Sequence, residues 1–237
     1  MEETVKPSYL DIPQFIRRPN YVVDIGWDYL PTYYYNAVSE CRLDINPPFQ
    51  RGHVWTDNQK VRYVEFILQG GQSGRDIYTN SPGWSEGATG DENNPYILVD
   101  GKQRLDAVLG YLNNEFPIFG GNYHRDYSGR INSSVGLRWH VNELRTYREV
   151  LQWYVDLNAG GVVHSDSEIA RVRELIVSGA CYTFPTLDVL KVQSRIGSEI
   201  ILRVIAEDEA DAARRKVENA ETIAKVSVKA KKKRWLG

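Results

Sequence analysis

Cysteine is scarce in this sequence, and long apolar runs are missing from it. Only two cysteines occur among 237 residues, Cys41 and Cys181, and they are far apart without Cys-x-x-Cys spacing. We therefore expect neither a disulfide framework nor a zinc knuckle, and a reducing compartment follows. No segment approaches the roughly 20 apolar residues of a membrane span, and residues 1–7 lack the apolar stretch of a signal peptide. These absences predict a cytoplasmic protein with no membrane partner.

An excess of one charge is missing too. The formal net charge is −2, so the whole chain has no general attraction to nucleic acid. Basic side chains instead cluster in residues 225–234, after the acidic stretch 207–211. This tail is either a solvated segment or one that contacts phosphates. The candidate nucleic-acid contacts are Lys231, Lys232, Lys233 and Arg234.

Helical and strand-like patterns alternate along the chain, which predicts an α+β fold. Residues 1–41 are rich in proline and tyrosine, so extended segments and turns are expected there. Within them, Tyr33–Tyr35 is either packed side chains or a stacking platform for bases. Residues 42–184 form the predicted core domain, and its first strand is expected at 42–45. Residues 187–228 are free of proline and charged, so we expect a helical C-terminal region over 185–237.

Two spacings predict helix starts. Thr56 and Gln59 have the spacing of a capping box, and the helix that follows should end at Gly70-Gly71. Ser165 and Glu168 repeat this spacing before a second apolar face. Residues 72–95 have the composition of a surface insertion, either a lid or a variable decoration, around a short strand at 76–79. Short strands and loops are expected over residues 116–148, although their positions are not fixed by the pattern, and Leu151–Leu157 is either helix or strand.

The strongest chemical signal is the segment Asp100-Gly101-Lys102-Gln103-Arg104. It follows the buried strand predicted at 96–99, and helical periodicity resumes at Leu105. Asp100 is therefore expected at the N-cap. Free backbone N–H groups, a glycine and two cations would then meet at one point, which is suited to an anion. The alternative is an N-cap aspartate beside ordinary surface cations.

Two further constellations accompany this segment. In Pro48-Phe49-Gln50-Arg51 a turn presents an amide and a guanidinium, with Trp55 nearby as a core residue or a cover for a base. In Asp156-Leu157-Asn158-Ala159-Gly160-Gly161, paired glycines permit a sharp bend, and Asn158 could cap it or bind a ligand edge. Taken separately, each fits a structural turn equally well.

The three motifs together, over about residues 42–176, resemble the GmrS-type domains of the ParB/sulfiredoxin-like superfamily. These domains are the nucleotide-using part of modification-dependent restriction and phage-defence proteins. The resemblance implies a small mixed sheet with flanking helices that binds and hydrolyses a nucleoside triphosphate, with a divalent cation, Mg²⁺, as cofactor. It also implies a bacterial host cell, including versions encoded by phages, and a DNA-directed system with DNA or a separate nuclease as partner.

The resemblance carries site roles over to matching positions. The catalytic candidates are Asp100, Gln103 and Arg104, and Asp100 would also hold Mg²⁺ or orient a water. The nucleotide-binding candidates are Gln50, Arg51, Gly101, Lys102 and Asn158. Lys102 stands where the family has a glutamine, which suits a polyphosphate but leaves open hydrolysis or binding alone. The His-Asn-His nuclease motif usual downstream in the family does not occur in this sequence.

Three functions remain open at this stage. The first is an NTP hydrolase or phosphotransferase that uses the Asp100–Arg104 segment. The second is a ParB-like DNA-binding protein or nuclease that contacts DNA through its basic tail and tyrosines. The third is a non-catalytic module that senses a nucleotide for a separate nuclease or modification enzyme.

Overall fold

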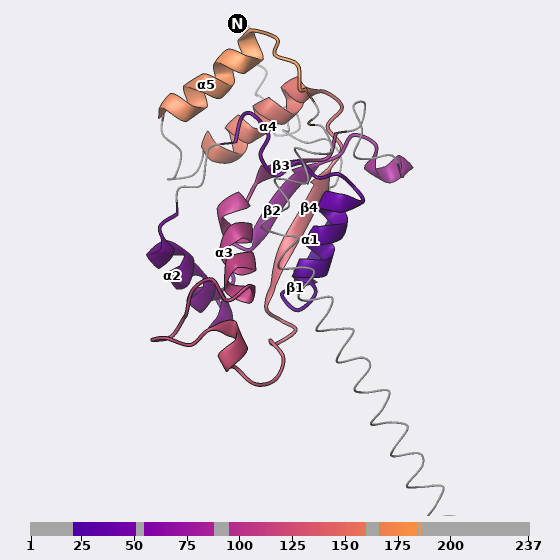
Figure 1. Ribbon diagram of the computed structural model, residues 1–237. Coiled ribbons are helices and arrows are strands. Elements are labelled where there is room, and N and C mark those ends of the chain that lie inside the picture. Colours follow the sequence, from indigo (N-terminus) through magenta and orange to yellow (C-terminus); the bar gives the residue numbers. More distant parts are fainter. Residues whose placement is uncertain (1–20, 51–54, 88–94, 160–165, 184, 186–237) are drawn as a thin grey trace, which may run out of the picture.

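The computed structural model describes residues 21–50, 55–87, 95–159, 166–183 and 185 (Figure 1). In chain order the elements are β1 (Tyr21–Gly26), α1 (Leu30–Ser39), α2 (Asp57–Leu68), β2 (Asp76–Asn80), η2 (Trp84–Glu86), β3 (Ile97–Asp100), α3 (Lys102–Leu112), η3 (His124–Asp126), β4 (Gly136–Asn142), α4 (Tyr147–Ala159) and α5 (Asp166–Val177). The described part is therefore a mixed α+β fold with one sheet of four strands, as expected. The helical region predicted for 185–237 lies outside it, apart from residue 185.

The sheet has the order β1-β4-β2-β3 and mixes both pairing directions. β1 pairs with β4 and β3 pairs with β2 antiparallel, whereas β2 and β4 are parallel. β2 thus lies inside the sheet, and Ile77 and Thr79 are completely buried. The prediction of a surface insertion over 72–95 was wrong for this strand, although the strand itself was expected at almost the same residues.

β4 is the longest strand of the sheet, and the sequence analysis expected short strands in this region without placing them. Its residues alternate, with Leu137, Trp139 and Val141 buried. Such alternation is the pattern of a strand with one face in the core. The signal was present in the sequence but was obscured by the glycine-, asparagine- and arginine-rich residues before it.

The N-terminal segment contributes a strand and a helix to the same body. β1 pairs with β4 over its whole length, and α1 replaces the extended segments and turns that were expected. Pro31 does not break α1 because it lies in the first turn, where a missing N–H costs no helical hydrogen bond. Tyr34 is buried, and the ring of Tyr33 meets Trp139 edge-on at 5.0 Å. These tyrosines are packed side chains.

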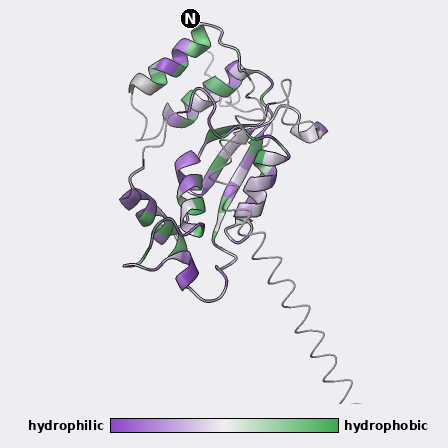
Figure 2. Cartoon of the chain, in the orientation of Figure 1, coloured by the Kyte–Doolittle hydropathy of each residue, from purple (hydrophilic) through white to green (hydrophobic). Residues whose placement is uncertain are grey.

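Two apolar clusters hold the described part together. The larger joins α1, α2 and α3 to one face of the sheet through residues such as Ile77, Leu98 and Trp139. The smaller joins α4 and α5 to Ile97 and Val99 of β3. Figure 1 shows α4 and α5 together at one end of the sheet, and Figure 2 shows hydrophobic residues along the central strands. Such burial is the main stabilising contribution to the fold.

The helix start predicted from Thr56 and Gln59 agrees with the structure. Thr56 and Gln59 form both hydrogen bonds of a capping box, and α2 ends beside Gly70 as expected. The segment 151–157 is helical and belongs to α4. The second capping box, Ser165 with Glu168, lies outside the described side chains. In the described part of the chain, no helix has the length and apolarity needed to cross a membrane.

The strand expected at 42–45 is reduced to a single bridge, a correction to the prediction. Asp44 pairs in parallel fashion with Ile97 at that point only. The carboxylate of Asp44 is buried, and it accepts hydrogen bonds from the backbone N–H of Asn46 at 2.9 Å and from the hydroxyl of Tyr182 at 2.6 Å. These bonds favour a turn over a continuing strand.

Candidate functional site

The corner between β3 and α3 begins with a glycine in a left-handed conformation. Gly101, not Asp100, is the N-cap of α3, so the prediction of an aspartate cap was wrong. The φ of Gly101 is +103°, and a Cβ at this position would lie 2.7 Å from Cδ1 of Ile77 and 3.1 Å from the carbonyl oxygen of Asp76. A side chain therefore cannot be accommodated. The close approach that requires glycine is to β2.

Because α3 begins after a glycine, its N-terminus is suited to binding an anion. Gly101 has no side chain, so it caps none of the N–H groups in the first turn. The first N–H groups of a helix have no partner within the helix, and the helix dipole adds partial positive charge there. A phosphate placed at this end would satisfy both.

The two cations of the motif do not meet at one point. Nη2 of Arg104 donates to Oδ2 of Asp100 at 2.6 Å, while Nζ of Lys102 lies 3.2 Å from Oδ2 of Asp106. Residues two apart point to opposite sides of a helix, whereas residues four apart share a side. Arg104 is therefore the cation beside Asp100, and Lys102 faces the other way. This corrects the expectation of two converging cations.

Gln50 and Gln103 make hydrogen bonds that connect the Pro48–Arg51 motif and Trp55 to β3 and α3. Nε2 of Gln50 donates to the carbonyl oxygens of Leu98, at 3.0 Å, and Val99, at 2.8 Å. Oε1 of Gln103 accepts from the backbone N–H of Trp55 at 3.1 Å. Both amides thus fix the segment around residue 50 against β3 and α3. Arg51 lies outside the described residues, so its position relative to this corner is not described.

Side chains of α4 and α5 contact Pro48 and Phe49. Nη1 and Nη2 of Arg171 donate to the carbonyl oxygens of Pro48, at 3.2 Å, and Phe49, at 3.1 Å. The ring of Phe49 also packs edge-on against Tyr154 of α4 at 5.1 Å. Asn158 donates to the carbonyl oxygen of Tyr154 at 2.7 Å, within the last turn of α4. The bend at 160–161 lies outside the described residues. Arg171 was missed by the sequence analysis because no spacing links it to residue 48.

A row of polar side chains crosses one face of the sheet beside this corner. We call it the polar stripe, and it comprises Asp24, Asp76, Tyr78, Asp100, Arg138 and His140. Arg138 pairs in register with Asp24 on one side and Asp76 on the other, and Tyr78 pairs with both His140 and Asp100. Directly paired residues lie on the same face of a sheet.

The contacts within the polar stripe are closest in its centre. Nε2 of His140 lies 2.7 Å from Oδ1 of Asp76, and the His140 ring stacks on Tyr78 with centroids 4.6 Å apart. Arg138 is more distant, with Nε 3.4 Å from Oδ1 of Asp24 and Nη1 4.0 Å from Oδ1 of Asp76. Alternating polar residues in Asp76-Ile77-Tyr78 and Arg138-Trp139-His140 are a sequence signal that could have indicated this face.

Charged residues of the polar stripe and of the corner both shift the pKa of the Tyr78 hydroxyl. Burial raises the pKa of Tyr78, and the negative charge of Asp76 raises it further. The charge of Arg104 opposes this shift, Asp100 adds to it, and Arg138 opposes it again. These groups therefore form one electrostatic neighbourhood around Tyr78.

Mg²⁺ would find the carboxylate of Asp100 at the corner. Within the described ranges no group of three or more His, Cys, Asp or Glu side chains is placed to hold a metal ion. Mg²⁺ in nucleotide sites commonly uses one or two carboxylates, and substrate phosphates and waters complete its shell. Asp100 fits that limited role, although one of its oxygens is engaged by Arg104.

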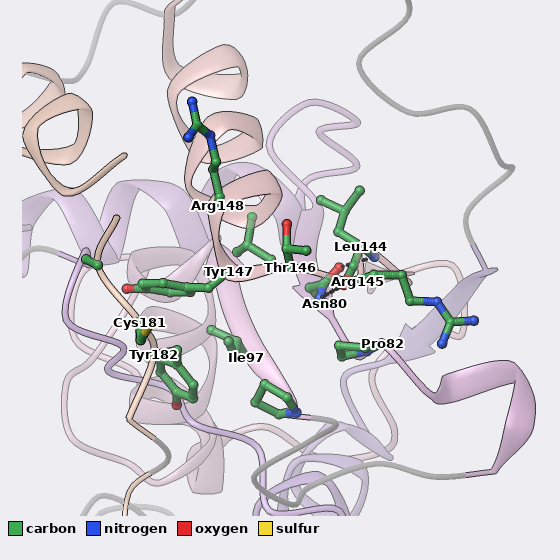
Figure 3. A pocket seen from close by; sticks show the side chains of 13 residues that line it. Asn80, Pro82, Ile97, Leu144, Arg145, Thr146, Tyr147, Arg148, Cys181 and Tyr182 are labelled. Carbon is green, nitrogen blue, oxygen red and sulfur yellow. Dashed lines mark hydrogen bonds between the residues drawn. The ribbon is translucent and has the colours of Figure 1, made fainter. Parts of the chain in front are cut away.

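A separate cavity of about 340 Å³ lies beside Asn80 and Ile97. These residues pair at the end of β2 and β3 that is away from Gly101. Figure 3 shows Tyr147, Tyr182 and Ile97 around its centre, whereas the guanidinium groups of Arg145 and Arg148 point away from it. No residue of the Asp100–Arg104 segment is among those that line this cavity. It is thus distinct from the corner at α3.

Comparison with known proteins gives no further guidance: no family model, curated protein or solved structure matches the chain.

Proposed function

We propose that this chain binds a nucleoside triphosphate at the N-terminus of α3 and hydrolyses it or transfers its phosphoryl group in a DNA-directed system. The supporting observation is the glycine-initiated start of α3, with the Asp100–Arg104 pair beside it. The resemblance to GmrS-type domains supplies the substrate class and the restriction, defence or phage DNA-modification setting. The assignment to a ParB/sulfiredoxin-like core is part of the same proposal.

In this proposal the backbone of α3 and Arg104 share the phosphates. The N–H groups of the first turn donate to phosphate oxygens. A guanidinium has five N–H donors, so Arg104 can keep its bond to Asp100 and still donate to an anion. Asp100 holds Mg²⁺ together with the phosphates, and the ion supplies neutralising charge. Lys102 contributes positive charge from the far side of the helix.

The glutamines have a supporting role in this proposal. Gln50 and Gln103 bond to backbone groups and so hold the first motif against the corner. Their substitution should loosen the site without removing a phosphate ligand. Asn158 is similarly engaged within α4.

The Arg104→Ala variant tests this proposal, with Arg62→Ala as a matched control. Arg62 is an exposed arginine on α2. A charged hydrogen bond contributes about 1.5–3 kcal/mol, so loss of Arg104 should weaken nucleotide affinity roughly 10- to 100-fold. Affinity for each common NTP is measured by calorimetry with Mg²⁺. Full affinity in Arg104→Ala, or an equal loss in Arg62→Ala, would contradict the proposal.

Phosphate release separates the catalytic proposal from the two alternatives. Tight binding without turnover, with and without DNA, would favour a non-catalytic nucleotide sensor. DNA binding that weakens steeply with salt and disappears on deletion of residues 225–237, without any nucleotide binding, would favour the DNA-binding function.

A further inference from the structure

The two edges of the sheet differ in how they are protected. β3 has four residues, and on the side away from β2 it forms a bridge with Asp44. The side chain of Gln50 also bonds to the carbonyl groups of Leu98 and Val99. β1, at the other edge, has six residues in one unbroken register with β4, and none of them is proline, lysine or arginine. Proteins usually shield an edge with such residues, a bulge or a covering segment, because an open edge can pair with another strand.

The register shows which backbone groups of β1 point away from β4. In an antiparallel pair, residues that exchange hydrogen bonds with the partner strand alternate with residues that do not. The N–H of Trp27 donates to the carbonyl oxygen of Val135 at 3.2 Å, and these two positions continue the register of β1 with β4. The outward-facing residues of β1 therefore include Val22 and Asp24. In the part of the chain that the structure describes, no hydrogen bond occupies their backbone N–H and C=O groups.

The side chains along this edge are exposed and mostly apolar. Tyr21 is 51% exposed and Val22 is 45% exposed, while Val23 packs partly buried against the larger apolar cluster. Asp24 is the single charged residue of β1, and Nε of Arg138 on β4 lies 3.4 Å from its Oδ1. A regular, exposed and largely apolar edge is suited to pairing with a further strand.

We propose that β1 pairs antiparallel with β1 of a second copy of this chain, which joins the two sheets into one. The two-fold axis of this dimer passes through Val23, so Val22 of one copy lies opposite Asp24 of the other. Both residues present outward N–H and C=O groups, so each of these pairs can exchange both of its hydrogen bonds. The inference goes beyond nucleotide binding at α3 and does not depend on it.

Charge and topology favour this register and a closed dimer. An axis at Asp24 would place the two carboxylates directly opposite each other, which is unfavourable. An axis at Val22 would pair fewer residues of β1. Growth stops at two copies because the β3 edge is covered by Asp44 and Gln50. The α3 corner lies beyond β4 and β2, so it stays accessible in the dimer.

A disulfide across the two-fold axis tests the register. Cys41 and Cys181 are first replaced by serine, and Val23→Cys is then added. Directly opposite residues that exchange no hydrogen bonds have Cα atoms about 4.5 Å apart, a separation that a disulfide spans. Mild oxidation should therefore yield a covalent dimer on a non-reducing gel.

Tyr21→Cys in the same serine background is the matched control. Position 21 is more exposed than position 23, so random collisions would cross-link it more readily. In the proposed dimer the two copies of position 21 lie roughly 13 Å apart, and little covalent dimer should form. Equal or greater cross-linking through position 21 would overturn the register.

Val22→Pro tests the hydrogen bonds of the edge. It removes an outward N–H that β4 does not use, and edge strands tolerate such a proline, so stability in urea should stay near that of wild type. The two copies together lose two hydrogen bonds, so the dissociation constant of the dimer should rise roughly 10- to 100-fold. Sedimentation velocity over a concentration series measures it. Val22→Ala keeps the N–H and should change dimerisation far less.

The outcomes separate this inference from the proposed function. A wild-type chain that stays monomeric at every concentration would leave the edge to a strand of another protein and overturn the dimer. Wild-type dimerisation in Val22→Pro would overturn it as well, and a large loss of stability in that variant would show that β4 uses the N–H. Nucleotide affinity, tested with Arg104→Ala, should be the same in Val22→Pro as in wild type, so the two proposals can fail separately.

Discussion

The α3 corner and the polar stripe are neighbours, but their residues come together in different ways. The corner is continuous in sequence: Asp100, Gly101 and Arg104 follow one another at the end of β3 and the start of α3. The stripe is assembled by strand register from four strands, so His140 meets Asp76 across 64 positions of sequence. A motif can therefore indicate residues that are neighbours in sequence, whereas the residues of the polar stripe are brought together by topology alone.

Both regions meet at β2, and Gly101 is the point of closest approach. Gly101→Ala should have the largest effect on stability because its Cβ would overlap Ile77 and the backbone of β2. Gly87→Ala is a close control, since Gly87 also has a positive φ, +73°, but nothing within 4 Å of a Cβ. We expect about 1 kcal/mol for the strained φ alone and about 2–4 kcal/mol at Gly101.

Urea unfolding of both variants measures this difference, and nucleotide affinity should fall with it in Gly101→Ala alone. Equal destabilisation of the two variants would mean that the close contact between the corner and β2 is unimportant.

Local signals in the sequence predicted local structure well. The capping box of Thr56 and Gln59, the strand before Asp100 and the helix after it all form. These features depend on hydrogen bonds and periodicity over a few residues. The aspartate cap failed for a local reason as well, because a glycine with positive φ directly after a strand can itself begin a helix.

Features that depend on pairing were not predicted. Nothing near Asp76 in the sequence indicates that β2 lies inside the sheet, or that β4 brings His140 to it. The opposite directions of Lys102 and Arg104 follow from helical geometry and could have been predicted. Arg171 bonds to backbone carbonyl groups more than 120 positions away, so it has no sequence signature.

The corner also depends on Gln50, which lies outside the sheet and whose side-chain amide donates hydrogen bonds to backbone carbonyl groups of β3. Gln50→Ala removes two hydrogen bonds and leaves the carbonyl groups of Leu98 and Val99 without them. We expect a loss of about 1–3 kcal/mol in stability and weaker nucleotide binding. Gln72 is the control, since its amide bonds to the nearby carbonyl of Gly70 at an exposed site. Gln72→Ala should change stability by less than about 0.5 kcal/mol.

Chemical denaturation and calorimetry measure both quantities for this pair of variants. If Gln50→Ala loses stability but keeps full nucleotide affinity, the Pro48–Arg51 motif stabilises the fold and does not contribute to nucleotide binding at the corner.

The smallest effect is expected at the outer end of the stripe. Arg138 is 53% exposed, and its contacts with Asp24 and Asp76 are 3.4 and 4.0 Å long. Exposed ion pairs of this kind contribute about 0–1 kcal/mol and weaken with salt. His140 holds Asp76 more closely, at 2.7 Å, so Arg138→Ala should leave the orientation of the imidazole intact. Stability should fall by less than about 1 kcal/mol, and kcat should stay near wild type at low and high salt. A large fall in kcat at unchanged stability would show that Arg138 acts on the substrate.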